Sequence, residues 1–140
     1  GGGTDAQVEA LGSFGIDAGL AFQLQDDLLN LVGDAEAQGK DFRSDITEGK
    51  RTMIVCWALE HLTGIERDEL LDILSSHTTD ALTLARAVEL MEDAGAIDAV
   101  RSYAHGLARS AKASLKGVEL AGDAHAVLES MADFFVERRG

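Results

Sequence analysis

The sequence predicts an all-α protein. No proline interrupts the 140 residues, and apolar residues recur at spacings of three and four, which is the period of an amphipathic helix. The apolar–polar alternation of a strand is nowhere sustained. With 46% hydrophobic residues, the chain can bury a core without disulfides or a structural metal, so we expect one helical domain over residues 1–140.

The first helix is expected from about Asp5 to Val32. Thr4 and Gln7 have the spacing of a capping box, in which each side chain hydrogen-bonds to the backbone amide of the other residue. Gly33 ends the apolar pattern. The following residues, 33–49, contain three glycines and mixed charges without periodicity, and this predicts a long loop.

Residues 52–62 are apolar on almost every face, which predicts a helix buried all round, with Cys56 as a buried structural thiol. Thr63 begins a second capping-box pattern, and a helix should follow it to about residue 74. Thr78 or Thr79 is expected to cap the next helix, which ends near Gly95.

The last two helices are predicted over residues 96–118 and from Asp123 to the terminal arginines. The first has an apolar stripe, and the second carries Val127, Met131 and Phe134 at helical spacing. The helices before residue 63 need partners on several sides, yet few amphipathic helices remain to cover them. We therefore expect the chain to be half of a larger helical bundle, or to be buried against another subunit.

Charge excludes one class of partner. The net charge is −13, with 25 acidic and 12 basic residues, which argues against nucleic acid because a phosphate backbone needs a basic surface. No apolar stretch is long enough for stable membrane insertion. No secretory signal pattern precedes the first helix, so we expect a cytoplasmic protein.

A polar stripe interrupts the leucines of the first helix. Gln23, Asp26, Asp27 and Asn30 fall at i, i+3, i+4 and i+7, on one helical face. Adjacent carboxylates among leucines repel each other unless a cation neutralises them, and oxygen ligands without Cys or His suit Mg²⁺. An Asp-Asp pair can also be a solvated helix face.

Two Gly-Lys pairs follow on the loop and place the ammonium groups of Lys40 and Lys50 after the carboxylates. Lysine is a good phosphate contact, so carboxylates, Mg²⁺ and lysines together suit a diphosphate. The spacing of a P-loop is missing, which argues against a nucleotide triphosphatase.

This order of features resembles the second aspartate-rich region of the trans-isoprenyl diphosphate synthases, the polyprenyl synthetase family. The resemblance is carried by GLAFQLQDDLLN, GKDFRSD and EGKRT between Gly19 and Thr52. Asp45 and Lys50 keep the family's interval between an aspartate and the second Gly-Lys. The ending MADFFVERR is similar to the family's last helix and basic tail.

The resemblance implies the C-terminal portion of the isoprenoid synthase helical bundle and a head-to-tail condensation. In such enzymes Mg²⁺ draws diphosphate from an allylic substrate, the double bond of isopentenyl diphosphate attacks the resulting carbocation, and a proton is lost. Members are commonly homodimers, with geranylgeranyl and farnesyl diphosphate synthases among them.

Carried over by position, the resemblance assigns a role to each matching residue. Metal ligands would be Asp26 and Asp27, with Asn30 offering a neutral oxygen where the third family aspartate usually stands. The substrate-binding residues would be Gln23 beside the allylic end, Lys40 and Lys50 on the diphosphate, Asp45 orienting a lysine or a metal-bound water, and Arg138 or Arg139 over isopentenyl diphosphate.

Two features separate the chain from the family pattern. Arg43 replaces a common glycine, which affects the expected backbone of the loop. A first aspartate-rich motif is absent, so we expect the C-terminal half of a synthase, missing its N-terminal half and inactive alone. The alternatives are a non-catalytic partner subunit of a synthase and an acidic helical interaction module, and the terminal arginines could simply complement the helix dipole.

Overall fold

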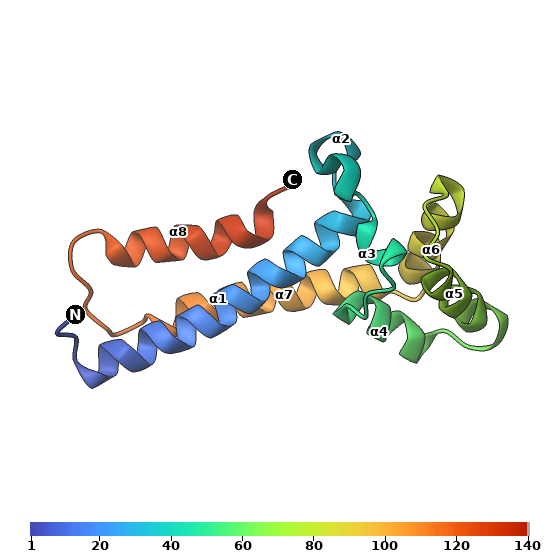
Figure 1. The fold of residues 1–140 in the computed structure, drawn as a ribbon. Helices are drawn as coiled ribbons and strands as arrows, with labels where there is room; N and C mark the ends of the chain where they lie inside the picture. Colours follow the sequence, from blue (N-terminus) through green and yellow to red (C-terminus); the bar gives the residue numbers. More distant parts are fainter. Residues whose placement is uncertain (140) are drawn as a thin grey trace. The chain divides into compact units, whose positions relative to one another are not determined.

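The computed structural model describes residues 1–139, apart from the side chains of residues 37, 38 and 40. The described chain is all helical, as predicted. Its elements are α1 (Asp5–Val32), α2 (Ala35–Gln38), the 3-10 helix η1 (Gly39–Asp41), α3 (Ser44–Thr47), α4 (Met53–His61), α5 (Gly64–Ser76), α6 (Ala81–Asp93), α7 (Ala96–Ser114) and α8 (Ala124–Glu137) (Figure 1). They form two compact units, and both α1 and α7 contribute to each.

The first unit contains residues 1–25 and 102–138. The capping box predicted at its start is confirmed: the Thr4 amide donates to Gln7 Oε1 at 2.8 Å, and the Gln7 amide donates to Thr4 Oγ1 at 3.3 Å. Three helices share a small core, with Phe14 and Ala18 on α1, Ala111 on α7, Leu115 directly after α7, and Ala132 on α8. Phe14 and Leu115 supply most of the side-chain volume of this core, and three alanines complete it.

The second unit contains residues 26–101 and Arg139, with α4 and α5 packed against α6. The helix predicted over residues 52–62 begins where Thr52 caps it, because Thr52 Oγ1 accepts from the Val55 amide at 3.4 Å. The next helix is less regular at its start. Thr63 makes no side-chain cap bond, so the capping box predicted there is not formed, and Gly64, the first residue of α5, has φ +57°.

Three further predictions in the second unit are wrong. Cys56 is exposed and not a buried thiol, because α4 buries only the face with Ile54, Val55 and Ala58. The cap of α6 is Asp80, whose carboxylate accepts from the Thr83 amide at 2.8 Å, and neither preceding threonine fills this role. Residues 33–49 are not an irregular loop, since α2, η1 and α3 lie within them.

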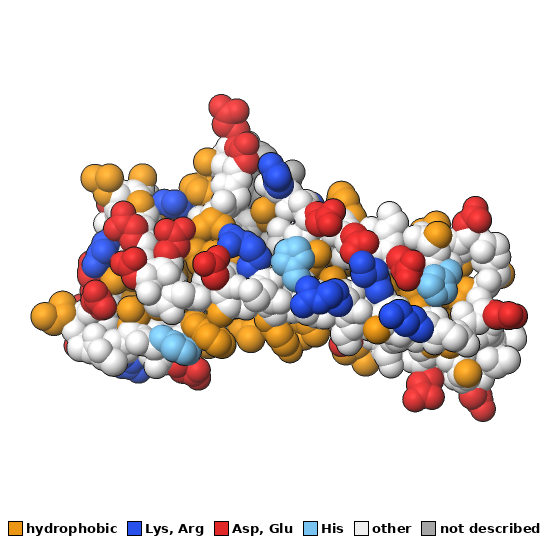
Figure 2. Space-filling model, turned by 180° about the vertical axis from the view of Figure 1, so that it is seen from behind, with side chains coloured by type: hydrophobic (Ala, Val, Ile, Leu, Met, Phe, Trp, Pro, Cys, Tyr) orange, Lys and Arg blue, Asp and Glu red, His pale blue; other side chains and the backbone are white. Residues whose placement is uncertain are grey.

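Large apolar side chains remain exposed on α1 and α8, and hydrophobic groups reach the surface among charged ones (Figure 2). Val8 and Ile16 are 65% and 72% exposed on α1, and Phe134 is 62% exposed on α8. Val127 and Met131, which the sequence places on the last helix at helical spacing with Phe134, are also exposed. No helix in the described part of the chain is both long and apolar enough to cross a bilayer.

Candidate metal and diphosphate site

The predicted polar stripe lies along the last turns of α1. Asp27 is buried at 7% exposure, Asp26 and Asn30 are half-buried, and Gln23 is exposed. The leucines bordering the stripe at 24, 28 and 31 are all buried. A carboxylate held this deep among leucines needs a compensating charge, because desolvation penalises its ionised form.

Lys50 supplies that charge. Its Nζ lies 3.4 Å from Asp27 Oδ1 and 3.2 Å from both carboxylate oxygens of Asp45. Burial alone would lower the pKa of Lys50, but the hydrogen bonds and negative charges of Asp45 and Asp27 outweigh it and raise that pKa. The ammonium is therefore protonated at neutral pH and bridges two carboxylates from different elements.

The short helix α3 ends in a way that sets the position of Lys50. The Lys50 amide donates to the Asp45 carbonyl, and the Gly49 amide donates to the Ile46 carbonyl, both at 2.9 Å. Gly49 is left-handed with φ +66°. This is the Schellman arrangement of a helix C-terminus, and it brings Lys50 back beside the aspartate five residues earlier.

Arg43 begins the same helix in a conformation that glycine usually takes. Its φ and ψ are 60° and 18°, in the left-handed region. The Arg43 amide donates to the Asn30 carbonyl at 2.7 Å, and its Nε donates to the Leu31 carbonyl at 3.3 Å. The arginine thus keeps the left-handed backbone and ties the turn to the end of α1.

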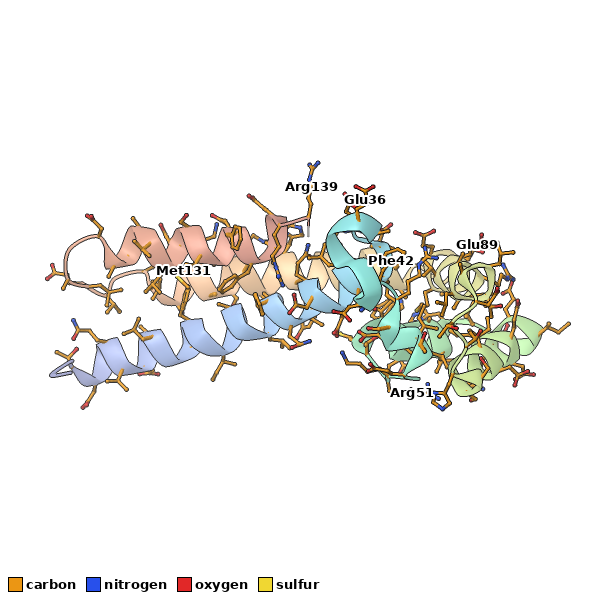
Figure 3. All side chains as sticks on the ribbon, turned by 45° about the horizontal axis from the view of Figure 1, so that its top comes forward. Glu36, Phe42, Arg51, Glu89, Met131 and Arg139 are labelled. Carbon is orange, nitrogen blue, oxygen red and sulfur yellow. The ribbon has the colours of Figure 1, made fainter. Side chains whose placement is uncertain are left out.

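The remaining predicted site residues lie in different surroundings. The Lys40 side chain is outside the described residues. Arg138 belongs to the first unit, where its guanidinium lies 4.2 Å over the Phe22 ring and Nη2 donates to the Phe22 carbonyl at 3.3 Å. Arg139 is exposed and points away from the backbone that carries it (Figure 3).

Sequence reasoning missed a buried polar contact near the end of the first unit's α8. Gln25 is buried at 8% exposure, and its Nε2 donates to the Arg138 carbonyl at 2.9 Å. Phe22 also meets Phe135 edge-on at a centroid distance of 5.1 Å. Gln25 lies between Leu24 and Asp26 and outside the polar stripe, and the available signal was a polar residue away from the polar face of α1.

The donor chemistry of the stripe fits Mg²⁺ held together with a phosphate ligand. Mg²⁺ prefers hard oxygen donors, and it usually takes one or two carboxylates while water and substrate phosphates complete its shell. Asp26 and Asp27 are such a pair. Among the described residues, no three or more His, Cys, Asp or Glu side chains gather into a cage made by protein alone.

Comparison with known proteins gives consistent results. Residues 1–91 match the family model described as Polyprenyl synthetase. The chain is 42% identical over 142 residues to a short chain isoprenyl diphosphate synthase from Methanothermobacter thermautotrophicus, covering 99% of this chain and 42% of that protein. The chain therefore spans about two-fifths of this relative's length.

Solved structures show the same fold. A polyprenyl synthase from Caulobacter crescentus, complexed with calcium and isoprenyl diphosphate, aligns with a TM-score of 0.85 at 36% identity, over 99% of this chain and 42% of the other. A geranylgeranyl pyrophosphate synthase from Corynebacterium glutamicum, complexed with isoprenyl diphosphate and magnesium, aligns with a TM-score of 0.88 at 31% identity, over 99% and 39%.

Proposed function

Because the chain belongs to the polyprenyl synthetase family, we propose that it is the C-terminal part of a Mg²⁺-dependent prenyltransferase that joins isopentenyl diphosphate to an allylic diphosphate. The observation that carries the proposal is the bridge from Lys50 to Asp27 and Asp45. It places a protonated amine beside a buried carboxylate, where the leaving diphosphate of such a reaction needs positive charge.

Each residue of the site has a defined task in this proposal. Asp26 and Asp27 hold Mg²⁺, which would stabilise negative charge on the departing diphosphate. Lys50 donates to the diphosphate oxygens, and Asp45 orients its amine. In the transfer, the carbon–oxygen bond of the allylic diphosphate breaks with both electrons on oxygen, the double bond of isopentenyl diphosphate attacks that carbon, and a proton leaves.

The less constrained assignments rest on position in the motif. Lys40 would contact the same diphosphate, and Gln23 would lie beside the allylic end. Arg139 would bind isopentenyl diphosphate. Arg138 has the same proposed role, but its contacts with Phe22 also anchor the end of α8.

We further propose that other helices of a larger domain cover this chain, and that the assembly is a homodimer. The exposed apolar side chains of α1 and α8, with Ile16 and Phe134 among them, support additional burial. The chain alone would bind diphosphate but would not complete the transfer, because the proposed reaction also needs the family's first aspartate-rich motif.

The test is binding of a non-reactive allylic diphosphate analogue to the full-length protein by calorimetry. We expect binding with Mg²⁺ and at least tenfold weaker binding with EDTA. Asp27→Asn should abolish the metal dependence, and Lys50→Ala should weaken binding about tenfold. Asp68→Asn and Lys116→Ala remove exposed charges elsewhere and should bind normally. Equal affinity with Mg²⁺ and with EDTA would refute the proposal.

A further inference from the structure

Asn30 makes more contacts with the segment after α1 than any other member of the polar stripe for which contacts are described. Its Nδ2 donates to the Asp41 carbonyl at 2.7 Å and to Ser44 Oγ at 3.1 Å. Its Oδ1 accepts from the Asp45 amide at 3.2 Å, and its main-chain carbonyl accepts from the Arg43 amide at 2.7 Å. One residue thus contacts four of the five residues 41–45.

The chemistry of these partners decides which side chain can make the contacts. The Asp41 carbonyl can only accept and the Asp45 amide can only donate, so position 30 must present a donor to one and an acceptor to the other. The same partners fix the orientation of the Asn30 amide. An ionised aspartate of the same shape has only acceptors and would set an oxygen against the Asp41 carbonyl oxygen.

The residues held in this way are those that position Lys50. Asp45 receives the Asn30 contact at its amide, and its carboxylate and carbonyl bind the amine and the amide of Lys50. A shift of this segment away from α1 would move Lys50 away from Asp27, because the two lie on different elements.

We infer that Asn30 is a positioning residue that clamps residues 41–45 onto the end of α1, and not the third oxygen ligand of the metal. Its side-chain oxygen is directed at the Asp45 amide, and both amide hydrogens have partners. The functional consequence rests on the proposed diphosphate site: Asn30 acts through Asp45 to hold Lys50 where it meets the leaving group.

The test is Asn30→Asp in the full-length protein, read by amide hydrogen exchange resolved to single residues. We expect the Arg43 and Asp45 amides to exchange at least tenfold faster, while amides in α6 keep their rates. Gln7→Glu is the matched control, because it also replaces an amide that donates to a main-chain carbonyl, that of Glu119 at 2.7 Å. It should leave exchange over residues 41–45 unchanged.

Binding of two probes separates positioning from ligation. For Asn30→Asp we expect an affinity for Mg²⁺ alone within twofold of wild type and about fivefold weaker binding of inorganic diphosphate with Mg²⁺. A metal ligand would instead gain a carboxylate and bind Mg²⁺ about tenfold more tightly. That tightening, or unchanged exchange at Arg43 and Asp45, would overturn the inference.

A second variant keeps the inference testable if Asn30→Asp lowers the overall helix content. Ser44→Ala removes one of the two donations from Asn30 and should raise exchange over residues 41–45 about threefold, and no increase would count against the clamp. If the wild-type protein binds no diphosphate, the proposed function fails, whereas the exchange data still decide whether Asn30 clamps the segment.

Discussion

Gly49 is the position where a single methyl group should disturb the site most. It has φ +66° at the end of α3, and a Cβ there would lie 2.7 Å from the main-chain carbonyl oxygen of Leu74. Leu74 is part of α5, so the oxygen cannot move as the end of a flexible side chain could. Gly49→Ala therefore meets a backbone penalty and a steric penalty together.

The two penalties can be estimated separately. The left-handed conformation costs a residue with a Cβ about 1–2 kcal/mol, of which the lower unfolded-state entropy of alanine returns about 0.4–1 kcal/mol. Forcing extra volume into a packed site costs about 1–3 kcal/mol more. We expect Gly49→Ala to lower the free energy of unfolding by about 2–4 kcal/mol.

Gly95 provides the matched control. It also follows a helix, its φ is +72°, and no heavy atom lies within 4 Å of the position of its Cβ. Gly95→Ala should therefore cost only the backbone part, about 0.5–1.5 kcal/mol. Urea denaturation followed by circular dichroism would measure both free energies. If Gly49→Ala costs no more than Gly95→Ala, the contact with Leu74 does not constrain the turn.

Three further predictions concern the same region. Arg43→Gly should be about 0.5–1 kcal/mol more stable than Arg43→Ala in urea denaturation, since only glycine relieves the left-handed φ, and the reverse order would contradict this. Thr52→Ala should lower the free energy of unfolding by about 1 kcal/mol, because it removes the hydroxyl that accepts from the Val55 amide, whereas Thr52→Ser keeps this hydroxyl and should not. The pKa of Lys50 is raised in the folded state, so its stabilisation is present below its ordinary value of 10.5 and is lost as pH rises through the folded pKa. The stability gap between wild type and Lys50→Met should shrink in alkaline denaturation series, and a constant gap would exclude the ion pairs as its cause.

The features predicted correctly from the sequence depend on neighbours close in the chain. The α1 capping box needs only residues three apart, and the polar stripe needs only the helical period, so both Thr4 and Asp27 lie where the pattern places them. Neighbours close in the chain were not sufficient to predict the burial of α4. Composition marks its residues as apolar, but the face that becomes buried depends on α6 and other packing partners, and this left Cys56 exposed.

The segment after α1 could not be predicted because its hydrogen bonds join distant residues. Its short helices lack the length that periodicity needs, and they are held by contacts such as those between Asn30 and residues 41–45. A glutamine or asparagine on a stripe is equally consistent with metal ligation and with backbone binding. For Asn30, the Asp41 carbonyl and the Asp45 amide that its side chain contacts favour backbone binding over metal ligation.

The interval between Asp45 and Lys50 has a local physical origin that the sequence does contain. The Lys50 amide donates to the carbonyl of Asp45, five positions earlier in the chain, and the glycine just before the lysine permits the left-handed turn. The spacing therefore encodes a helix end, and this helix end sets the amine beside its carboxylate. Contact with Asp27 is a separate requirement, because it needs α3 to be held against α1, and this is the task that we assign to Asn30. A local turn and a distant clamp together account for the position of Lys50, so a variant that breaks either one should displace the amine while leaving the other intact.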